Sequence, residues 1–331
     1  MSLTTTKREP GQVLKRVASP LWRAVNSPAA KWFVVALPLL WLLCFLAFPL
    51  LEIFQISFTT QARSVNPLFF LGENGFGTNF NFDAYFGMLY DPVWQEWSPG
   101  YFAVPFWRSL RLASVSTLIM LCFAYPMAYW IATSSPRRQL VLLILVLLPF
   151  WTPSLLRIYS LIGLMRGDGL INEGLQLLRF VDQPLRLRGS DFAIYFGMYI
   201  TYLPLMILPL YAALSRMDRS LHEAATDLGA GGFTVFRTII FPLSLPGVIA
   251  GCILVFVPAF GEYMVPTLLG SPDHKMMGAK IWDVYAKEKF LPGASAMAVI
   301  LMTVLVLPVV IYQLRSDSQG ESSHQKPQEA S

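Results

Sequence analysis

Six long apolar runs constrain the fold of this 331-residue chain more than any other feature. A helix needs about 20 predominantly apolar residues to cross the hydrocarbon core of a bilayer, and each run reaches that length. Only 14% of the residues are charged, well below the rough quarter found in soluble domains. Short segments of strict alternation, which would indicate a membrane β-barrel, are missing. We therefore expect an all-α polytopic membrane protein with six transmembrane helices, at about residues 32–54, 107–132, 140–165, 192–215, 245–269 and 292–314.

The polar segments around these runs predict the topology. Residues 1–31 form a basic N-terminal arm, residues 315–331 form a polar tail that we expect to be disordered, and Arg137 and Arg138 lie in a short turn between two runs. Because Lys and Arg are enriched in cytosolic segments, we expect both termini in the cytosol and residues 32–314 as the transmembrane domain. The arm would contact anionic membrane lipid, which accounts for the net charge of +5 without a nucleic-acid partner.

A polar segment, residues 216–242, predicts a helix–turn–helix hairpin outside the bilayer. Ser220 is a favourable N-cap, and Glu223 follows at the spacing of a capping box. Gly229 is placed to end the first helix in a left-handed conformation. A second helical run is expected to end at Pro242. The first helix would carry a narrow apolar stripe, formed by Leu221, Ala224, Ala225 and Leu228.

This hairpin resembles the EAA loop of bacterial ABC importer permeases, whose pattern is E-A-A-x3-G-x9-I-x-L-P. The chain departs from the pattern at one place, Phe241, where the family has Leu. The resemblance implies an ABC type I importer permease fold in the bacterial inner membrane, with a cytosolic hairpin whose short helix docks on a separate ATPase subunit. It assigns the coupling role to Glu223, Ala224, Ala225, Asp227 and Gly229. The alternative is that Glu223 only caps a surface helix.

Charged residues in the runs are candidates for the transport pathway, because a carboxylate inside a membrane span is costly and faces a cavity, a partner or a pathway. Glu262 is the first candidate, since it follows a proline and a glycine and has Tyr263 beside it. A carboxylate next to an aromatic ring suits an ammonium group. The alternative for Glu262 is a salt bridge to Arg157 or to another basic residue at the outer ends of the spans. Glu52 is a weaker candidate near the outer end of the first run.

The third run carries further candidates around two prolines, Pro149 and Pro153. The prolines predict a kink whose freed backbone groups face protein or water. Trp151 and Tyr159 could gate or stack on a substrate, with ordinary packing as the alternative. Arg157 is better suited to orient a carboxylate or a carbonyl than to bind a cation. In the fifth run, Gly247 and Gly251 have the small-xxx-small spacing that allows close helix packing.

Enzyme motifs fail in this sequence. It has no Gly-Lys dipeptide and therefore no P-loop, and Thr226 replaces the second histidine that an H-E-x-x-H zinc motif would need. We predict a transport subunit rather than an enzyme, with no metal and no cofactor of its own.

Two further segments resemble the spermidine/putrescine branch of the permeases, and within it the putrescine permeases: residues 148–159 and 255–266. Asn172 and the turn at 182–184 support the same resemblance. It implies import of putrescine or another polyamine by alternating access, together with a second EAA-type permease, a periplasmic polyamine-binding protein and an ATPase dimer that binds ATP and Mg. The alternatives are an ABC permease for another small solute, such as an organic cation, an amino acid or a ferric complex, and a secondary transporter driven by an ion gradient.

Overall fold

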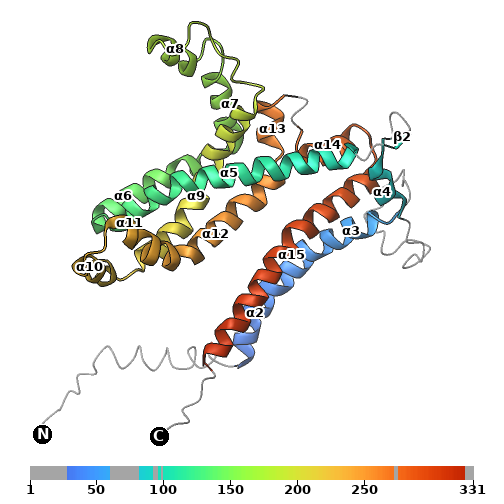
Figure 1. Ribbon diagram of the computed structural model, residues 1–331. Helices are drawn as coiled ribbons and strands as arrows, with labels where there is room; N and C mark the ends of the chain where they lie inside the picture. The colour runs from blue at the N-terminus through green and yellow to red at the C-terminus, as the bar shows by residue number, and fades with distance from the viewer. Residues whose placement is uncertain (1–27, 60–81, 92–95, 98–99, 272–274, 325–331) are drawn as a thin grey trace, which may run out of the picture. The chain divides into compact units, whose positions relative to one another are not determined.

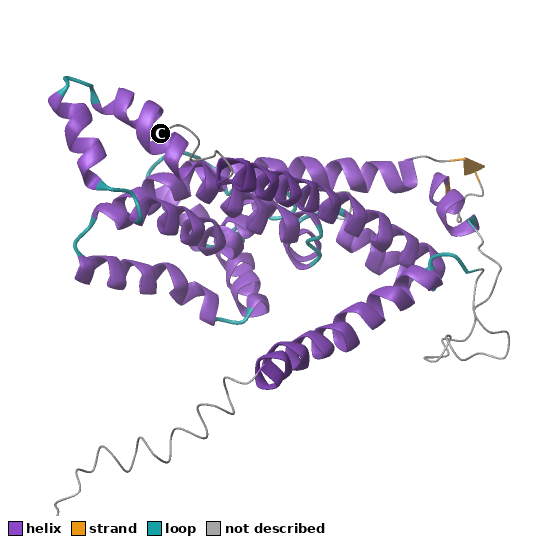
Figure 2. Cartoon of the chain, turned by 90° about the horizontal axis from the view of Figure 1, so that it is seen from below, coloured by secondary structure: helices purple, strands orange, loops and turns teal. Residues whose placement is uncertain are grey.

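The computed structural model describes residues 28–59, 82–91, 96–97, 100–271 and 275–324. The predicted N-terminal arm lies outside the described residues, except for its last four positions, which already belong to a helix. Helices make up nearly all of the described chain (Figures 1 and 2). Their bounds are α2 Pro28–Leu42, α3 Phe48–Ile56, α4 Asp83–Phe86, α5 Gly100–Thr133, α6 Pro136–Leu147, α7 Ser154–Leu164, α8 Leu170–Leu177, α9 Asp191–Ser215, α10 Arg219–Asp227, α11 Gly232–Val235, α12 Phe241–Phe260, α13 Met264–Leu269, α14 Met277–Ala286 and α15 Leu291–His324.

The described strands are short and form one antiparallel pair. β1 (Tyr90–Asp91) pairs with β2 (Glu96–Trp97), and Tyr90 lies opposite Trp97.

Five helical segments of the described chain are long and apolar enough to cross a membrane. A sixth span results if the bent pair 136–151 and 154–164, whose two helices meet at 91°, counts as one. The five segments are Val34–Ile56, Gly100–Thr133, Asp191–Ser215, Gly232–Phe260 and Leu291–Ile311.

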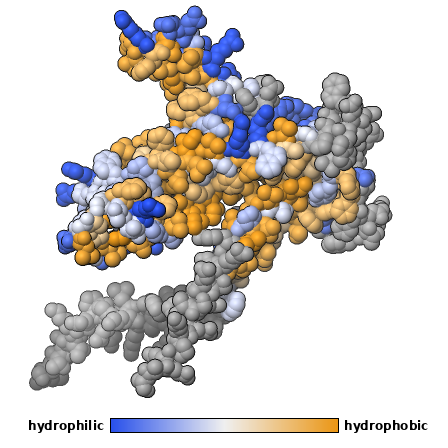
Figure 3. Space-filling view, viewed as in Figure 1, coloured by the Kyte–Doolittle hydropathy of each residue, from blue (hydrophilic) through white to orange (hydrophobic). Residues whose placement is uncertain are grey.

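The chain divides into two compact units. The first comprises residues 1–56 and 65–77, and its described part is α2, α3 and the turn between them. The second comprises residues 57–64 and 78–331 and holds the packed core. In Figure 3, hydrophobic residues cover the middle of this second unit, and hydrophilic residues gather near α8 and α10. The exposed apolar side chains include Leu118, Phe123, Trp130, Leu140 and Leu145 on α5 and α6, as a lipid-facing surface requires.

The core forms where α9 packs against both α5 and α12. Between helices in lipid, close van der Waals contact replaces the hydrophobic effect as the main attraction, so small residues at the contact matter. A Cβ atom at Gly247 would lie 2.5 Å from the Cβ of Ala213, and one at Gly251 would lie 2.9 Å from the Sδ of Met206. The two glycines of α12 thus meet α9 directly, which confirms the close approach predicted from their spacing.

Two π-helical turns each end two residues before a proline. The first turn, Leu43–Ala47, precedes Pro49, and the second, Phe236–Ile240, precedes Pro242. A proline ring collides with the carbonyl four residues back, and one wider turn absorbs the conflict without ending the helix. The prediction that the helix stops at Pro242 is therefore wrong, because α11, the π turn and α12 run on without a break.

The third predicted span is broken as its two prolines indicated. Pro149 lies in a 3₁₀ turn, Leu148–Trp151, that follows α6, and Pro153 precedes α7 in an extended conformation with Thr152. The 91° bend confirms the predicted kink.

The C-terminal helix α15 continues to His324, into the tail for which we expected no helix. Adding a residue to an existing helix costs far less than starting one, so a span can extend into polar sequence.

Candidate functional site

The hairpin helix α10 begins two residues earlier than the sequence predicted. Asp218 is the N-cap, and its Oδ1 accepts a hydrogen bond from the backbone N–H of Ser220 at 3.0 Å. This backbone hydrogen bond lowers the pKa of the fully exposed Asp218 carboxyl below its usual value. The prediction of Ser220 as the N-cap is wrong, because a carboxylate caps as well as a hydroxyl and also gains from the helix dipole. Glu223 is therefore not needed as a cap.

Gly229 ends α10 as predicted. Its φ of +82° lies in the left-handed region, where glycine carries no steric penalty. The N–H of Gly229 donates to the carbonyl of Thr226 at 2.9 Å, and the N–H of Ala230 donates to the carbonyl of Ala225 at 3.0 Å. These two bonds form a Schellman motif, so the turn after α10 has one defined geometry.

The outer face of the hairpin offers apolar side chains that the described chain leaves uncovered. Leu228 is 89% exposed and Phe233 is 76% exposed. Glu223, Ala224 and Asp227 of α10 are exposed as well. A pocket of about 350 Å³ lies between the hairpin and the ends of α5 and α9, with Glu223 and residues of the π turn in its wall. Exposed apolar anchors with charged neighbours are suited to bind a protein partner.

The second candidate region lies where the fifth span is interrupted. Glu262 lies between α12, which ends at Phe260, and α13. Its Oε1 accepts hydrogen bonds from the N–H groups of Tyr263 at 3.0 Å and Met264 at 2.8 Å, at the start of α13. Its other oxygen accepts a hydrogen bond from the hydroxyl of Tyr202 on α9. The carboxylate is thus a helix cap and not one half of a salt bridge. The alternative that Glu262 pairs with Arg157 is wrong for the described chain.

Arg157 binds carbonyl groups, which is one of the two roles predicted for it. Its guanidinium donates to the carbonyl of Thr152 at 3.2 Å and to the carbonyl of Thr201 at 3.4 Å, and it lies 5.9 Å from the ring centre of Phe150. The first contact reaches back into the break before α7, and the second reaches α9.

The remaining candidates differ in where they lie. Trp151 is 83% exposed and Tyr159 is 60% exposed, so packing inside this chain does not account for either ring. Tyr263 contacts the ring of Trp282 on α14 at 5.6 Å. Glu52 lies on α3 in the first unit.

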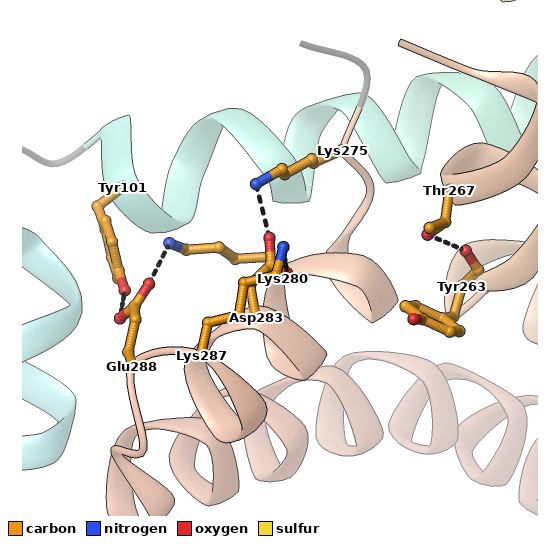
Figure 4. A network of polar contacts seen from close by, with 8 residues as sticks. All are labelled: Tyr101, Tyr263, Thr267, Lys275, Lys280, Asp283, Lys287 and Glu288. Atoms are coloured by element: carbon orange, nitrogen blue, oxygen red, sulfur yellow. Dashed lines mark hydrogen bonds and ion pairs between the residues drawn. The ribbon is translucent and has the colours of Figure 1, made fainter. Parts of the chain in front are cut away.

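A network of polar contacts anchors α14 (Figure 4). The ammonium group of Lys280 lies 3.4 Å from the ring centre of Tyr101 on α5 and 3.3 Å from a carboxylate oxygen of Glu288. The Tyr101 hydroxyl donates to the other oxygen of Glu288. Burial lowers the pKa of Lys280, although Glu288 opposes the shift.

Asp283 is the second centre of this network, and it accepts from Lys275 and from Lys287, both at 2.6 Å. Burial alone would raise the pKa of Asp283, but the two lysines outweigh it and lower the pKa. The described charges of α14 are thus paired within the chain.

Asn172, one residue of the sequence resemblance, is fully buried. Its side chain donates to the carbonyls of Arg166 at 2.8 Å and Leu185 at 3.1 Å and accepts from the N–H of Leu185 at 2.9 Å. It closes the loop that carries α8.

Sequence reasoning missed Tyr202 and the polar network of α14. Tyr202 and Glu262 are 60 positions apart, and Tyr101 and Glu288 are 187 apart. No local spacing signals a pair at such separation.

Comparison with known proteins identifies the fold and the family. Residues 124–318 match the family described as "Binding-protein-dependent transport system inner membrane component". The chain is 34% identical to the spermidine/putrescine transport system permease protein PotB of Haemophilus influenzae, over 88% of this chain and 95% of the relative. It is 35% identical to the PotB protein of Escherichia coli K12, over 82% of this chain and 92% of the relative.

A solved structure confirms the fold. The chain is similar to a chain of a bacterial ABC transporter involved in the import of the acidic polysaccharide alginate, with a TM-score of 0.66 at 15% identity, over 90% of this chain and 99% of that one. The predicted all-α polytopic class and the ABC importer permease fold are thereby confirmed. A permease of this kind is a non-catalytic multi-pass subunit of the inner membrane. It carries no cofactor and works with an ATPase, which binds ATP, and with a binding protein. The chain belongs to the family of binding-protein-dependent transport system inner membrane components.

Proposed function

We propose that this chain is the permease subunit of an ATP-driven importer of polyamines, of the spermidine/putrescine type. One observation carries the proposal: its similarity to spermidine/putrescine permeases extends over most of both chains. Which of the two polyamines is preferred is not distinguished by this similarity. Putrescine is the substrate that we favour from the sequence segments around Trp151 and Glu262.

In this proposal α10 is the coupling helix, and its contact surface comprises Glu223, Ala224, Ala225, Asp227 and Gly229. The defined Schellman turn and the uncovered side chains of Leu228 and Phe233 support docking on an ATPase subunit. The hairpin, with both termini, lies in the cytosol.

The assembly contains two ATPase subunits, a second EAA-type permease and a periplasmic polyamine-binding protein. A second permease is supported by a further relative, the spermidine/putrescine permease protein PotC of Escherichia coli K12, which is 33% identical over 39% of this chain and 49% of its own length. The exposed rings of Trp151 and Tyr159 lie beside the broken span, and we assign them to the substrate pathway with Arg157, Glu262, Tyr263 and Glu52.

The experiment is uptake by proteoliposomes that contain the whole complex, with labelled putrescine or spermidine outside and ATP at the ATPase side. We expect uptake that requires ATP and the binding protein. Glu223→Ala should abolish uptake while the permease still inserts in the membrane. The matched control is Glu173→Ala, which removes an exposed glutamate from another short helix, α8.

Each outcome has a distinct meaning. Uptake that continues without ATP and follows an ion gradient would show a secondary transporter. ATP-dependent uptake of another solute, but of neither polyamine, would overturn the substrate. Wild-type uptake by the Glu223→Ala complex would overturn the coupling role of α10.

A further inference from the structure

The two interrupted spans meet the same point of α9. Arg157, just after the break between α6 and α7, donates to the carbonyl of Thr201 at 3.4 Å. Glu262, in the break between α12 and α13, accepts from the hydroxyl of Tyr202. Thr201 and Tyr202 are consecutive residues of a helix that runs unbroken from Asp191 to Ser215.

The chemistry of the two contacts explains why they are needed. A break in a membrane helix frees backbone groups that lipid cannot satisfy. At the first break the freed groups include the carbonyl of Thr152, and the cation of Arg157 binds it at 3.2 Å. At the second break the freed groups are N–H groups at the start of α13, and the anion of Glu262 binds them. The cation thus binds carbonyl oxygens and the anion binds N–H groups. Each of the two side chains also makes a hydrogen bond to α9.

Packing at the same level of α9 is tight. A Cβ atom at Gly197, one turn before Thr201, would lie 2.5 Å from the Cδ1 of Leu269 and 2.8 Å from the Cγ1 of Val265, both on α13. The Thr201 hydroxyl donates to the carbonyl of Gly197 at 2.8 Å. Leu269 and Val265 lie directly against Gly197, so α13 cannot slide along α9 without losing this packing. The second break is thus fixed to α9 by packing as well as by the hydrogen bond between Tyr202 and Glu262.

We propose that the Thr201–Tyr202 step of α9 ties the two interrupted spans into one unit during transport, with Tyr202 and Arg157 as positioning residues. Tyr202 fixes the carboxylate of Glu262 on α13, and Arg157 fixes the break before α7. The inference rests on the proposed transport function and adds to it which residues hold the pathway helices in register.

A tie of this kind predicts that Arg157 and Glu262 depend on each other without touching. Variants of residues that share no partner normally have independent effects. If α9 joins the two breaks, a variant that loosens one break already removes most of the transport activity that depends on the other break. The second variant then has little further effect.

The test is a set of double-mutant cycles in the reconstituted complex. The variants are Tyr202→Phe, Arg157→Lys and Glu262→Gln, alone and in pairs. The control is Tyr199→Phe on the same helix, since the Tyr199 hydroxyl has no hydrogen-bond partner among the described residues and its ring packs on Phe123. Three quantities are measured: the kcat and KM of ATP-driven uptake, the binding-protein-stimulated ATP hydrolysis, and the thermal unfolding temperature.

We expect Tyr202→Phe to lower the kcat of uptake roughly tenfold, the size of one charge-assisted hydrogen bond, with little change in KM or unfolding temperature. Tyr199→Phe should behave as wild type. Adding Tyr202→Phe to Glu262→Gln should have almost no further effect. Arg157→Lys and Glu262→Gln together should cost several-fold less than the product of their single effects.

Effects of Arg157→Lys and Glu262→Gln that simply multiply would overturn the tie. A Tyr202→Phe complex that equals the Tyr199→Phe complex, or one that only loses thermal stability, would overturn the positioning role of Tyr202. These results are distinct from a failure of the proposed substrate, which would show as a wild-type complex that takes up no polyamine yet retains stimulated ATP hydrolysis. In that case the double-mutant cycles use the rate of binding-protein-stimulated ATP hydrolysis in place of the rate of uptake.

Discussion

Gly247→Ala is the sharpest test of the helix contact that holds the core. The new Cβ would lie 2.5 Å from the Cβ of Ala213 and 2.8 Å from the carbonyl oxygen of Pro209. Neither atom can rotate away, because one is bonded directly to a Cα atom and the other belongs to the backbone. A normal carbon–carbon contact is about 3.5–4.0 Å, so α9 and α12 would have to separate by about 1 Å.

The cost follows from that displacement. Overpacking of a well-packed contact costs about 1–3 kcal/mol, which changes the unfolding equilibrium constant roughly 5- to 150-fold. Gly251→Ala should cost less, because its nearest neighbour is the flexible end of Met206, at 2.9 Å. Gly163→Ala on α7 is the control, because its Cβ would meet no atom within 4 Å. There alanine gains helix propensity, up to about 1 kcal/mol.

The assay is reversible unfolding of the purified permease in lipid nanodiscs, followed by tryptophan fluorescence. The expected order of stability is Gly163→Ala at or above wild type, then Gly251→Ala, then Gly247→Ala. A Gly247→Ala protein as stable as the Gly163→Ala protein would refute the reasoning, because it would mean that α9 and α12 do not pack at the distance described.

Three further outcomes follow from contacts described above. Gly229→Ala should weaken ATP coupling and destabilise the α10 turn by about 1 kcal/mol, because the φ of Gly229 is +82°. Gly229→Asn should retain most of the coupling, since asparagine tolerates that conformation. The amount of solute taken up per ATP hydrolysed measures the coupling of both variants. Asn172→Ala should cost about 1–3 kcal/mol and speed proteolysis of the loop that carries α8, whereas Glu173→Ala beside it should not. The lowered pKa of Asp283 means that this carboxylate contributes its full stabilisation above the unfolded pKa of 3.8 and loses it as the pH falls below that value. Trp282 fluorescence should report this acid transition in the wild type. An acid transition that persists in Asp283→Asn would show that Asp283 is not its cause.

The sequence predicted those features that depend on local patterns. Apolar length predicted the spans, the pair of prolines predicted the broken third span, and the requirement for positive φ predicted Gly229 as the end of α10. The exact start of α10 could not be predicted, because Asp218 and Ser220 are both good caps.

Other features depend on tertiary contacts that no local pattern records. A proline in a helix favours a stop, yet a π turn at Phe236–Ile240 lets the helix pass Pro242. For Glu262 the composition of the span predicted a special role, but its partner Tyr202 comes from another helix. The pathway residues themselves remain predictions.

The uninterrupted helix Gly232–Phe260 has a mechanical consequence. Its 29 residues make a continuous rod about 43 Å long, enough to cross a bilayer. One end of the rod begins three residues after Gly229, and the other ends two residues before Glu262. Because the helix is continuous over this length, a displacement of the hairpin also moves the α13 cap, and the π turn, Pro246 and Pro258 are the places where the rod can bend in between.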